Sequence, residues 1–76
     1  MRTLEEYRRL PWTIVVRFHN EQGGYWSARV VELPGCMVAL ADRGALLTEL
    51  DTVIELTLET MLRDREPIPE PAAATV

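Results

Sequence analysis

One long amphipathic segment constrains the fold of this chain more than any other feature. Between residues 46 and 62, apolar side chains recur at spacings of three and four, the pattern of a single helix face. Asp42 lies just before this run and has a side chain suited to a helix N-cap, so we expect one helix from there to about Asp64. The apolar stripe comprises Leu46, Leu47, Leu50, Val53, Ile54, Leu58, Met61 and Leu62. We expect this stripe to pack across one face of a sheet.

Three short segments before the helix have the features of β-strands. Residues 12–18 and 25–32 alternate apolar and polar side chains around a glycine-containing turn, which predicts an antiparallel hairpin. Residues 36–40 are short, apolar and uncharged, and they predict a third strand. The inner face is expected to carry Trp12, Ile14, Val16, Phe18, Trp26, Ala28 and Val30. The fold class is therefore α+β, a three-stranded antiparallel sheet followed by one long helix (βββα), with Leu50, Ile54 and Met61 buried against Ile14, Val16 and Val30.

The two ends of the chain are predicted to lie outside this βββα domain, which spans residues 12–66. Residues 1–11 form an N-terminal extension, either disordered or a short helix in which Thr3 and Glu6 have the spacing of a capping box. Residues 67–76 form a proline-rich tail that favours an extended path and frays from Ala72 onward.

The size of the chain predicts that its own core is small. Cys36 is the only cysteine among 76 residues, so neither an intramolecular disulfide nor a structural zinc site can reinforce the fold. We therefore expect a homo-oligomer, a dimer or a tetramer. No apolar run is long enough to span a membrane and no signal sequence is visible, so the expected location is the cytoplasm, with no membrane partner. The net charge of −4 favours a basic partner over autonomous nucleic-acid binding.

The sequence contains no clear catalytic constellation. Carboxylates are absent from the interiors of the predicted strands; Glu21 lies in a turn, Glu32 ends a strand and Asp42 caps the helix. A metal-dependent hydrolase would need these three carboxylates to converge, and their positions in the sequence do not favour this. We therefore expect that the chain is not an enzyme and binds no metal or cofactor. His19 is expected to be an exposed hairpin histidine and Cys36 a small buried side chain.

Leu56 lies off the apolar stripe of the helix, among Glu49, Thr52, Glu59, Thr60 and Arg63. Its side chain is either simply exposed or a contact for another subunit or partner.

Two motifs resemble those of HicB-type antitoxins. Residues 32–36, Glu-Leu-Pro-Gly-Cys, are similar to the family signature P-[DE]-L-P-G-C, and Glu66–Pro71, Glu-Pro-Ile-Pro-Glu-Pro, is similar to the GEPIPEP that follows the family's helix. Val31 replaces the usual proline, and the entry Asp42-Arg43-Gly44-Ala45 lacks the usual capping-box glutamate. The similarity extends from about Trp12 to Pro71.

This resemblance implies a partial RNase H-like fold that lacks the catalytic carboxylates of that fold. It implies a bacterial toxin–antitoxin system in which a non-catalytic interaction module covers the active site of a HicA-type mRNA interferase toxin. The C-terminal DNA-binding domain of full-length antitoxins has no counterpart here, so no direct DNA binding by the chain alone is expected. The alternatives are a small RNase H-like metal-dependent hydrolase and an orphan oligomeric ligand-binding domain.

The residues selected for these roles fall into two groups. The candidates for contact with a partner are Glu21, Glu32, Asp42 and Leu56. The residues given a structural role are Leu33, Pro34, Gly35 and Cys36.

Overall fold

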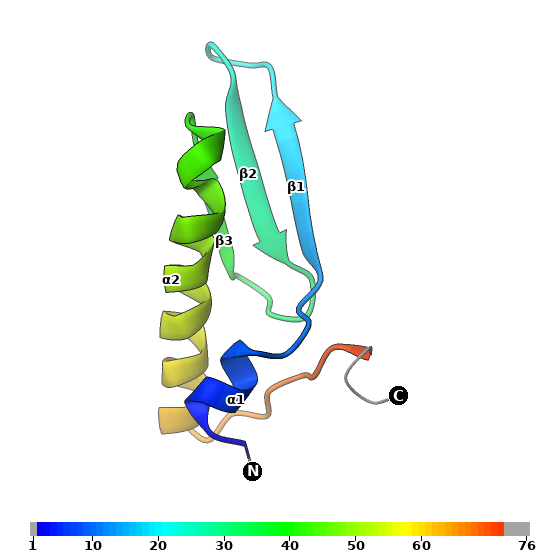
Figure 1. The fold of residues 1–76 in the computed structure, drawn as a ribbon, viewed down its shortest axis with the longest axis vertical. Coiled ribbons are helices and arrows are strands. Elements are labelled where there is room, and N and C mark those ends of the chain that lie inside the picture. Colours follow the sequence, from blue (N-terminus) through cyan, green and yellow to red (C-terminus); the bar gives the residue numbers. More distant parts are fainter. Residues whose placement is uncertain (1, 73–76) are drawn as a thin grey trace.

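The computed structural model describes residues 2–72 and has the predicted α+β architecture. Its elements, in chain order, are α1 (Leu4–Arg8), β1 (Ile14–His19), β2 (Tyr25–Val30), β3 (Met37–Leu40) and α2 (Arg43–Arg63). The strands form one antiparallel sheet in the order β1-β2-β3, and α2 runs along one face of it (Figure 1). The βββα core predicted from the sequence is confirmed.

The β1–β2 hairpin closes through a tight turn of the type that suits the twist of two antiparallel strands. Gln22 and Gly23 both have positive φ, 53° and 86°, and the Gly24 amide donates to the Glu21 carbonyl at 3.0 Å, as in a type I′ turn. Gly24 is also favoured over other residues, because its φ is 93° and a Cβ there would lie 3.1 Å from the Phe18 ring. The resulting register pairs Ile14 with Val30, Val16 with Ala28 and Phe18 with Trp26.

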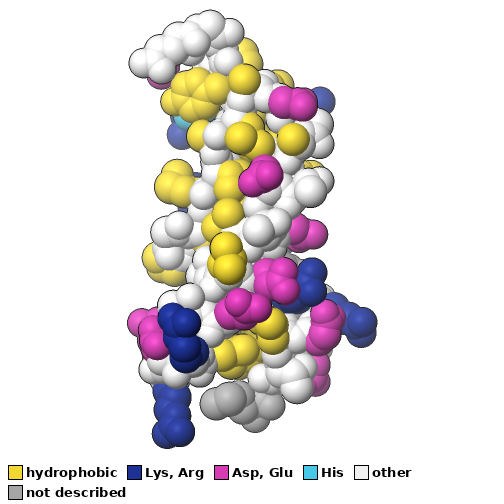
Figure 2. Space-filling view, turned by 90° about the vertical axis from the view of Figure 1, so that its left-hand side faces the viewer, with side chains coloured by type: hydrophobic (Ala, Val, Ile, Leu, Met, Phe, Trp, Pro, Cys, Tyr) yellow, Lys and Arg dark blue, Asp and Glu magenta, His cyan; other side chains and the backbone are white. Residues whose placement is uncertain are grey.

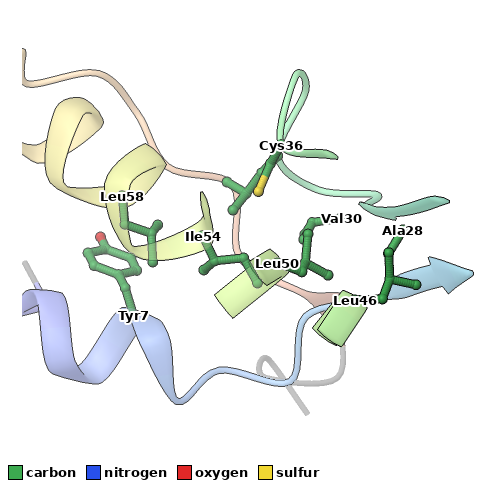
Figure 3. Close-up of a cluster of buried hydrophobic side chains, with 9 residues drawn as sticks. Tyr7, Ala28, Val30, Cys36, Leu46, Leu50, Ile54 and Leu58 are labelled. Atoms are coloured by element: carbon green, nitrogen blue, oxygen red, sulfur yellow. The ribbon is translucent and has the colours of Figure 1, made fainter. Parts of the chain in front are cut away.

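The core lies between α2 and the part of the sheet formed by β2 and β3. Figure 3 shows Leu46, Leu50, Ile54 and Leu58 of α2 along one side of this core, facing Ala28 and Val30. The core cluster of buried apolar side chains comprises Tyr7, Ala28, Val30, Leu33, Cys36, Leu46, Leu50, Ile54 and Leu58. The inward parity predicted for β2 is therefore confirmed.

The prediction that β1 contributes to this core is wrong. Ile14 and Val16 are each 42% exposed and Phe18 is 54% exposed, although their register with β2 places them on the face that α2 packs against. Among the described elements, α2 contacts β2 and β3 but not β1. Because α2 packs on β2 and β3, the outer strand β1 extends beyond the helix. On α2, Leu47 is exposed and Met61 is only partly buried.

The N-terminal segment and the described part of the tail pack together at one end of α2. The capping box at Thr3 is present, with the Thr3 hydroxyl accepting from the Glu6 amide and the Glu6 carboxylate accepting from the Thr3 amide. Arg2 donates two hydrogen bonds to the Glu70 carboxylate, at 2.9 and 3.1 Å, and the neighbouring Pro71 is buried. The predicted fraying concerns mainly residues 73–76, which lie outside the described range.

Both ends of α2 have identifiable caps. The Asp42 carboxylate accepts from the Gly44 amide at 2.8 Å, which confirms Asp42 as the N-cap. At the other end, the Glu66 amide donates to the Met61 carbonyl and the Arg65 amide to the Leu62 carbonyl, the two bonds of a Schellman motif. Arg65 occupies the position in this motif that glycine favours, with φ of 57°.

Candidate partner-binding site

The Leu-Pro-Gly-Cys segment forms a reverse turn that connects β2 to β3. The Cys36 amide donates to the Leu33 carbonyl at 3.0 Å, and Gly35 has φ of 83°, as the third position of a type II turn requires. Pro34 occupies the second position, where its fixed φ suits the turn. Leu33 and Cys36 therefore both insert into the core, while Pro34 stays exposed between them. The structural role assigned to these four residues stays a prediction, and this turn is the geometry in which they would fulfil it.

Pro34 forms one wall of an open pocket of about 490 Å³. Its other walls come from α2 and from Glu66, the first residue of the Glu66–Pro71 motif. The lining residues are Pro34, Leu56, Thr57, Thr60, Met61 and Glu66. The two motifs on which the family resemblance rests therefore meet at one site, although they are separated by the whole of α2. Leu56 is 57% exposed and lines this pocket.

Cys36 lies in the core near this pocket, beneath the turn, and its thiol is buried. Burial raises the pKa of the thiol above its ordinary value, and a side-chain hydrogen bond with Thr57 acts in the opposite direction. A buried thiol with a raised pKa is a poor nucleophile. The structure thus supports the prediction of Cys36 as a packed side chain.

The surface of α2 around Leu56 is acidic. Between Arg43 and Arg63, the helix carries four carboxylates and no basic residue, and Figure 2 shows acidic and hydrophobic side chains interspersed along this side of the molecule. Glu55 lies 4.0 Å from Arg8, whereas Glu49, Asp51 and Glu59 have no ion-pair partner among residues 2–72.

The sequence also suggests an ion pair on this surface, between Glu59 and the arginine four residues later. In the structure that guanidinium, Arg63, lies 3.5 Å from Asp64 instead. Glu59 therefore remains available on the same helix surface as Leu56.

The three candidate carboxylates do not meet. Glu21 lies in the β1–β2 turn and Asp42 at the start of α2, both at the same end of the sheet, because β3 runs antiparallel to β2. Glu32 follows the opposite end of β2, where its carboxylate accepts hydrogen bonds from the Thr13 amide and hydroxyl at 3.0 and 2.6 Å. No group of three or more His, Cys, Asp or Glu side chains suited to a metal ion occurs among the described residues. Of the four predicted contact residues, only Leu56 lines the pocket.

His19 lies at the end of β1 and is half-buried, not in an exposed loop as predicted. Its ring stacks on Tyr25 with centroids 4.6 Å apart, and its Nε2 lies 2.8 Å from the Ser27 hydroxyl. Tyr25 and Ser27 both belong to β2 and lie on the sheet face away from α2, so the His19 side chain packs across the hairpin on that face.

The Leu33–Cys36 motif and the Glu66–Pro71 motif are each visible in the sequence, but the pocket that they share is not. The exposed leucine at position 56 was the one signal in the helix that pointed to it. No helix among residues 2–72 has the length and apolar character needed to cross a membrane. Comparisons of the chain with protein-family models, with curated proteins and with solved structures find no match in any of the three.

Proposed function

We propose that this chain is a non-catalytic interaction module of the HicB antitoxin type, which binds a small basic mRNA interferase of the HicA type and covers its active site. The observation that carries the proposal is the site around Leu56, where an exposed leucine lies beside an open pocket on an acidic helix. A single exposed leucine is ordinary, but Leu56 lines one concave surface together with Pro34 and Met61, and apolar side chains gathered in this way favour a protein contact.

The charge of this surface supports a basic partner. Glu49 and Glu59 flank Leu56 along α2 without ion-pair partners among the described residues, and Glu66 lines the pocket itself. An enzyme that binds RNA needs a basic surface against phosphate, so its active-site face complements an acidic surface. Glu21, Glu32 and Asp42 stay proposed contacts at the two ends of the sheet, where a partner larger than the pocket could reach one end or the other.

The structure offers less support for the hydrolase alternative. Glu21 and Glu32 lie beyond opposite ends of β2, a strand of six residues, and strands rise about 3.3 Å per residue. These carboxylates are therefore too far apart to share a pair of metal ions, which lie about 4 Å from each other in such enzymes. We accordingly retain the antitoxin-type function and, with it, the cytoplasm as the proposed location, because mRNA is the toxin's substrate there.

The proposal can be tested with a HicA-type toxin encoded next to this chain. The purified chain should bind that toxin and stop it from cleaving RNA, and Leu56→Glu should weaken binding by at least roughly tenfold, because it places a charge where an apolar contact forms. Met37→Glu is a matched control, since Met37 is also 57% exposed but lies on β3, on the face of the sheet away from α2.

Two results would overturn the proposal. One is a toxin that retains full activity in the presence of excess chain. The other is magnesium- or manganese-dependent RNA cleavage by the chain itself, abolished by Glu32→Gln.

A further inference from the structure

The outer edge of β1 carries backbone groups that no strand in the described structure pairs with. Antiparallel pairing alternates along a strand, so every second residue directs its N–H and C=O toward the neighbouring strand. The Val31 amide donates to the Thr13 carbonyl at 2.9 Å, which fixes the phase of this alternation. Val15, Arg17 and His19 therefore bond to β2, and Ile14, Val16 and Phe18 direct their N–H and C=O groups away from it.

The side chains of the same three residues are only partly covered, although the Phe18 ring contacts Trp26 with centroids 4.9 Å apart. Ile14, Val16 and Phe18 lie on the α2 face of the sheet but beyond the reach of the helix. Figure 1 shows β1 as the outer strand, with no helix or strand alongside its open edge. Natural proteins protect such edges with charges, prolines, bulges or very short strands. β1 has none of these at its three edge-facing positions.

We propose that a second copy of this chain pairs with β1, antiparallel and in the register that places Val16 opposite the partner's Val16. In this register Ile14 faces the partner's Phe18, and Phe18 faces the partner's Ile14. All three pairs are of the hydrogen-bonded kind, so each exchanges two N–H···O bonds and every open group of β1 between residues 14 and 18 is used. The two sheets become one, and the exposed apolar side chains become cross-strand neighbours.

The neighbouring registers are poorer, which makes the proposed pairing specific. A shift by two residues in one direction places Arg17 opposite the partner's Arg17, and like charges directly opposite destabilise a sheet. The same shift in the other direction places Phe18 opposite residue 12 of the second copy, outside the strand. In the proposed register Arg17 faces the partner's Val15 instead.

The other edge of the sheet is less suited to pairing. β3 has only four residues, and the Val30 amide bond to the Cys36 carbonyl sets the alternation so that only Met37 and Ala39 direct backbone groups outward. Its helix-side residues, Val38 and Leu40, already pack against the core. A short strand with covered side chains is a protected edge.

This dimer is independent of the proposed toxin binding, because it uses none of the residues that line the pocket. Each dimer would carry two such pockets. A failure of either proposal therefore leaves the other intact.

Amide hydrogen exchange of the unmodified protein, followed by NMR across a concentration series, tests the pairing residue by residue. The amides of Val15, Arg17 and His19 should be protected at every concentration, since they bond within one copy. The amides of Ile14, Val16 and Phe18 should exchange at least roughly ten times more slowly at the highest protein concentration than at the lowest. Monomers throughout, or a dimer in which these three amides exchange as fast as in the monomer, would overturn the proposal.

Variants test the register. Val16→Pro removes an outward-facing amide without breaking a hydrogen bond to β2, and it should weaken self-association, measured by sedimentation, by roughly tenfold. The control is Val31→Lys, which changes an exposed valine outside β1 and should leave association unchanged. Proline is not used at position 31, because the Val31 amide donates to the Thr13 carbonyl.

Cross-linking provides a second measure of the register. Directly opposite residues have Cα atoms about 5.5 Å apart, within disulfide range. Val16→Cys should therefore cross-link under mild oxidation and Phe18→Cys should not. The native thiol of Cys36 is buried and does not compete. Equal cross-linking of both variants, or of neither, would exclude the register.

Discussion

Leu47 and Leu50 provide a matched test of the packing of α2. Both belong to the apolar stripe seen in the sequence, yet Leu50 is 1% exposed and Leu47 is 55% exposed. Truncating a buried leucine to alanine costs about 2–5 kcal/mol, because the side chain loses its burial and leaves a cavity. A chain of 76 residues has a stability of only about 4–11 kcal/mol at 0.05–0.15 kcal/mol per residue. Leu50→Ala should therefore remove a large part of the stability.

The control is Leu47→Ala, which changes the same side chain in the same helix with nearly the same helix propensity. Since more than half of Leu47 already contacts water, we expect a cost below about 1 kcal/mol. In a domain of this size, 1 kcal/mol corresponds to about 4–8 °C in Tm. Thermal unfolding followed by circular dichroism should thus show a fall of roughly 10 °C or more for Leu50→Ala and a few degrees for Leu47→Ala. Equal losses would refute the placement of α2 on the sheet.

Three further predictions concern single residues. Burial raises the pKa of Glu32, but the hydrogen bonds from the Thr13 hydroxyl and amide outweigh it and hold the pKa below the ordinary 4.5. This carboxylate therefore stabilises the fold above pH 4.5, and that stability is lost as the pH falls through the lowered pKa. The urea midpoint of unfolding should fall more steeply on acidification in the native chain than in Glu32→Gln. Parallel curves of midpoint against pH would contradict this. Arg65→Gly should raise Tm by a few degrees, because glycine adopts the positive φ without strain. The control Arg63→Gly, inside the helix, should lower Tm. A lower Tm for both variants would exclude strain at Arg65. The Cys36 thiol should react with Ellman's reagent roughly a hundredfold faster in urea than in the native protein, and rapid native reaction would show that it is accessible.

The features that could be predicted from the sequence depend on neighbouring residues. Asp42 was identifiable as an N-cap because a short acidic side chain precedes an apolar run at helical spacing, and its bond to the Gly44 amide confirms this. The capping box of α1 follows from the same local chemistry at Thr3 and Glu6. The type II turn at Pro34-Gly35 is equally local.

The pocket could not be predicted in this way, because its walls come from three separate parts of the chain. Pro34 reaches it through the turn, Leu56 through α2 and Glu66 through the Schellman motif that ends the helix. That motif depends on a positive φ at Arg65, a residue that the sequence does not mark as a helix stop. The Arg2–Glu70 pair has the same character, since it joins residues 68 positions apart.

The position of β1 shows most clearly where periodicity stops being informative. Alternation identifies the face on which Ile14, Val16 and Phe18 lie, and the register with β2 bears this out. It does not say whether another layer covers that face. The connection from β3 to α2 is only Ala41 and Asp42, so the helix begins beside β3 and covers the adjacent part of the sheet. A chain with three strands and one long helix therefore leaves its first strand uncovered, and the apolar side chains of that strand are the physical basis for a second copy at this edge.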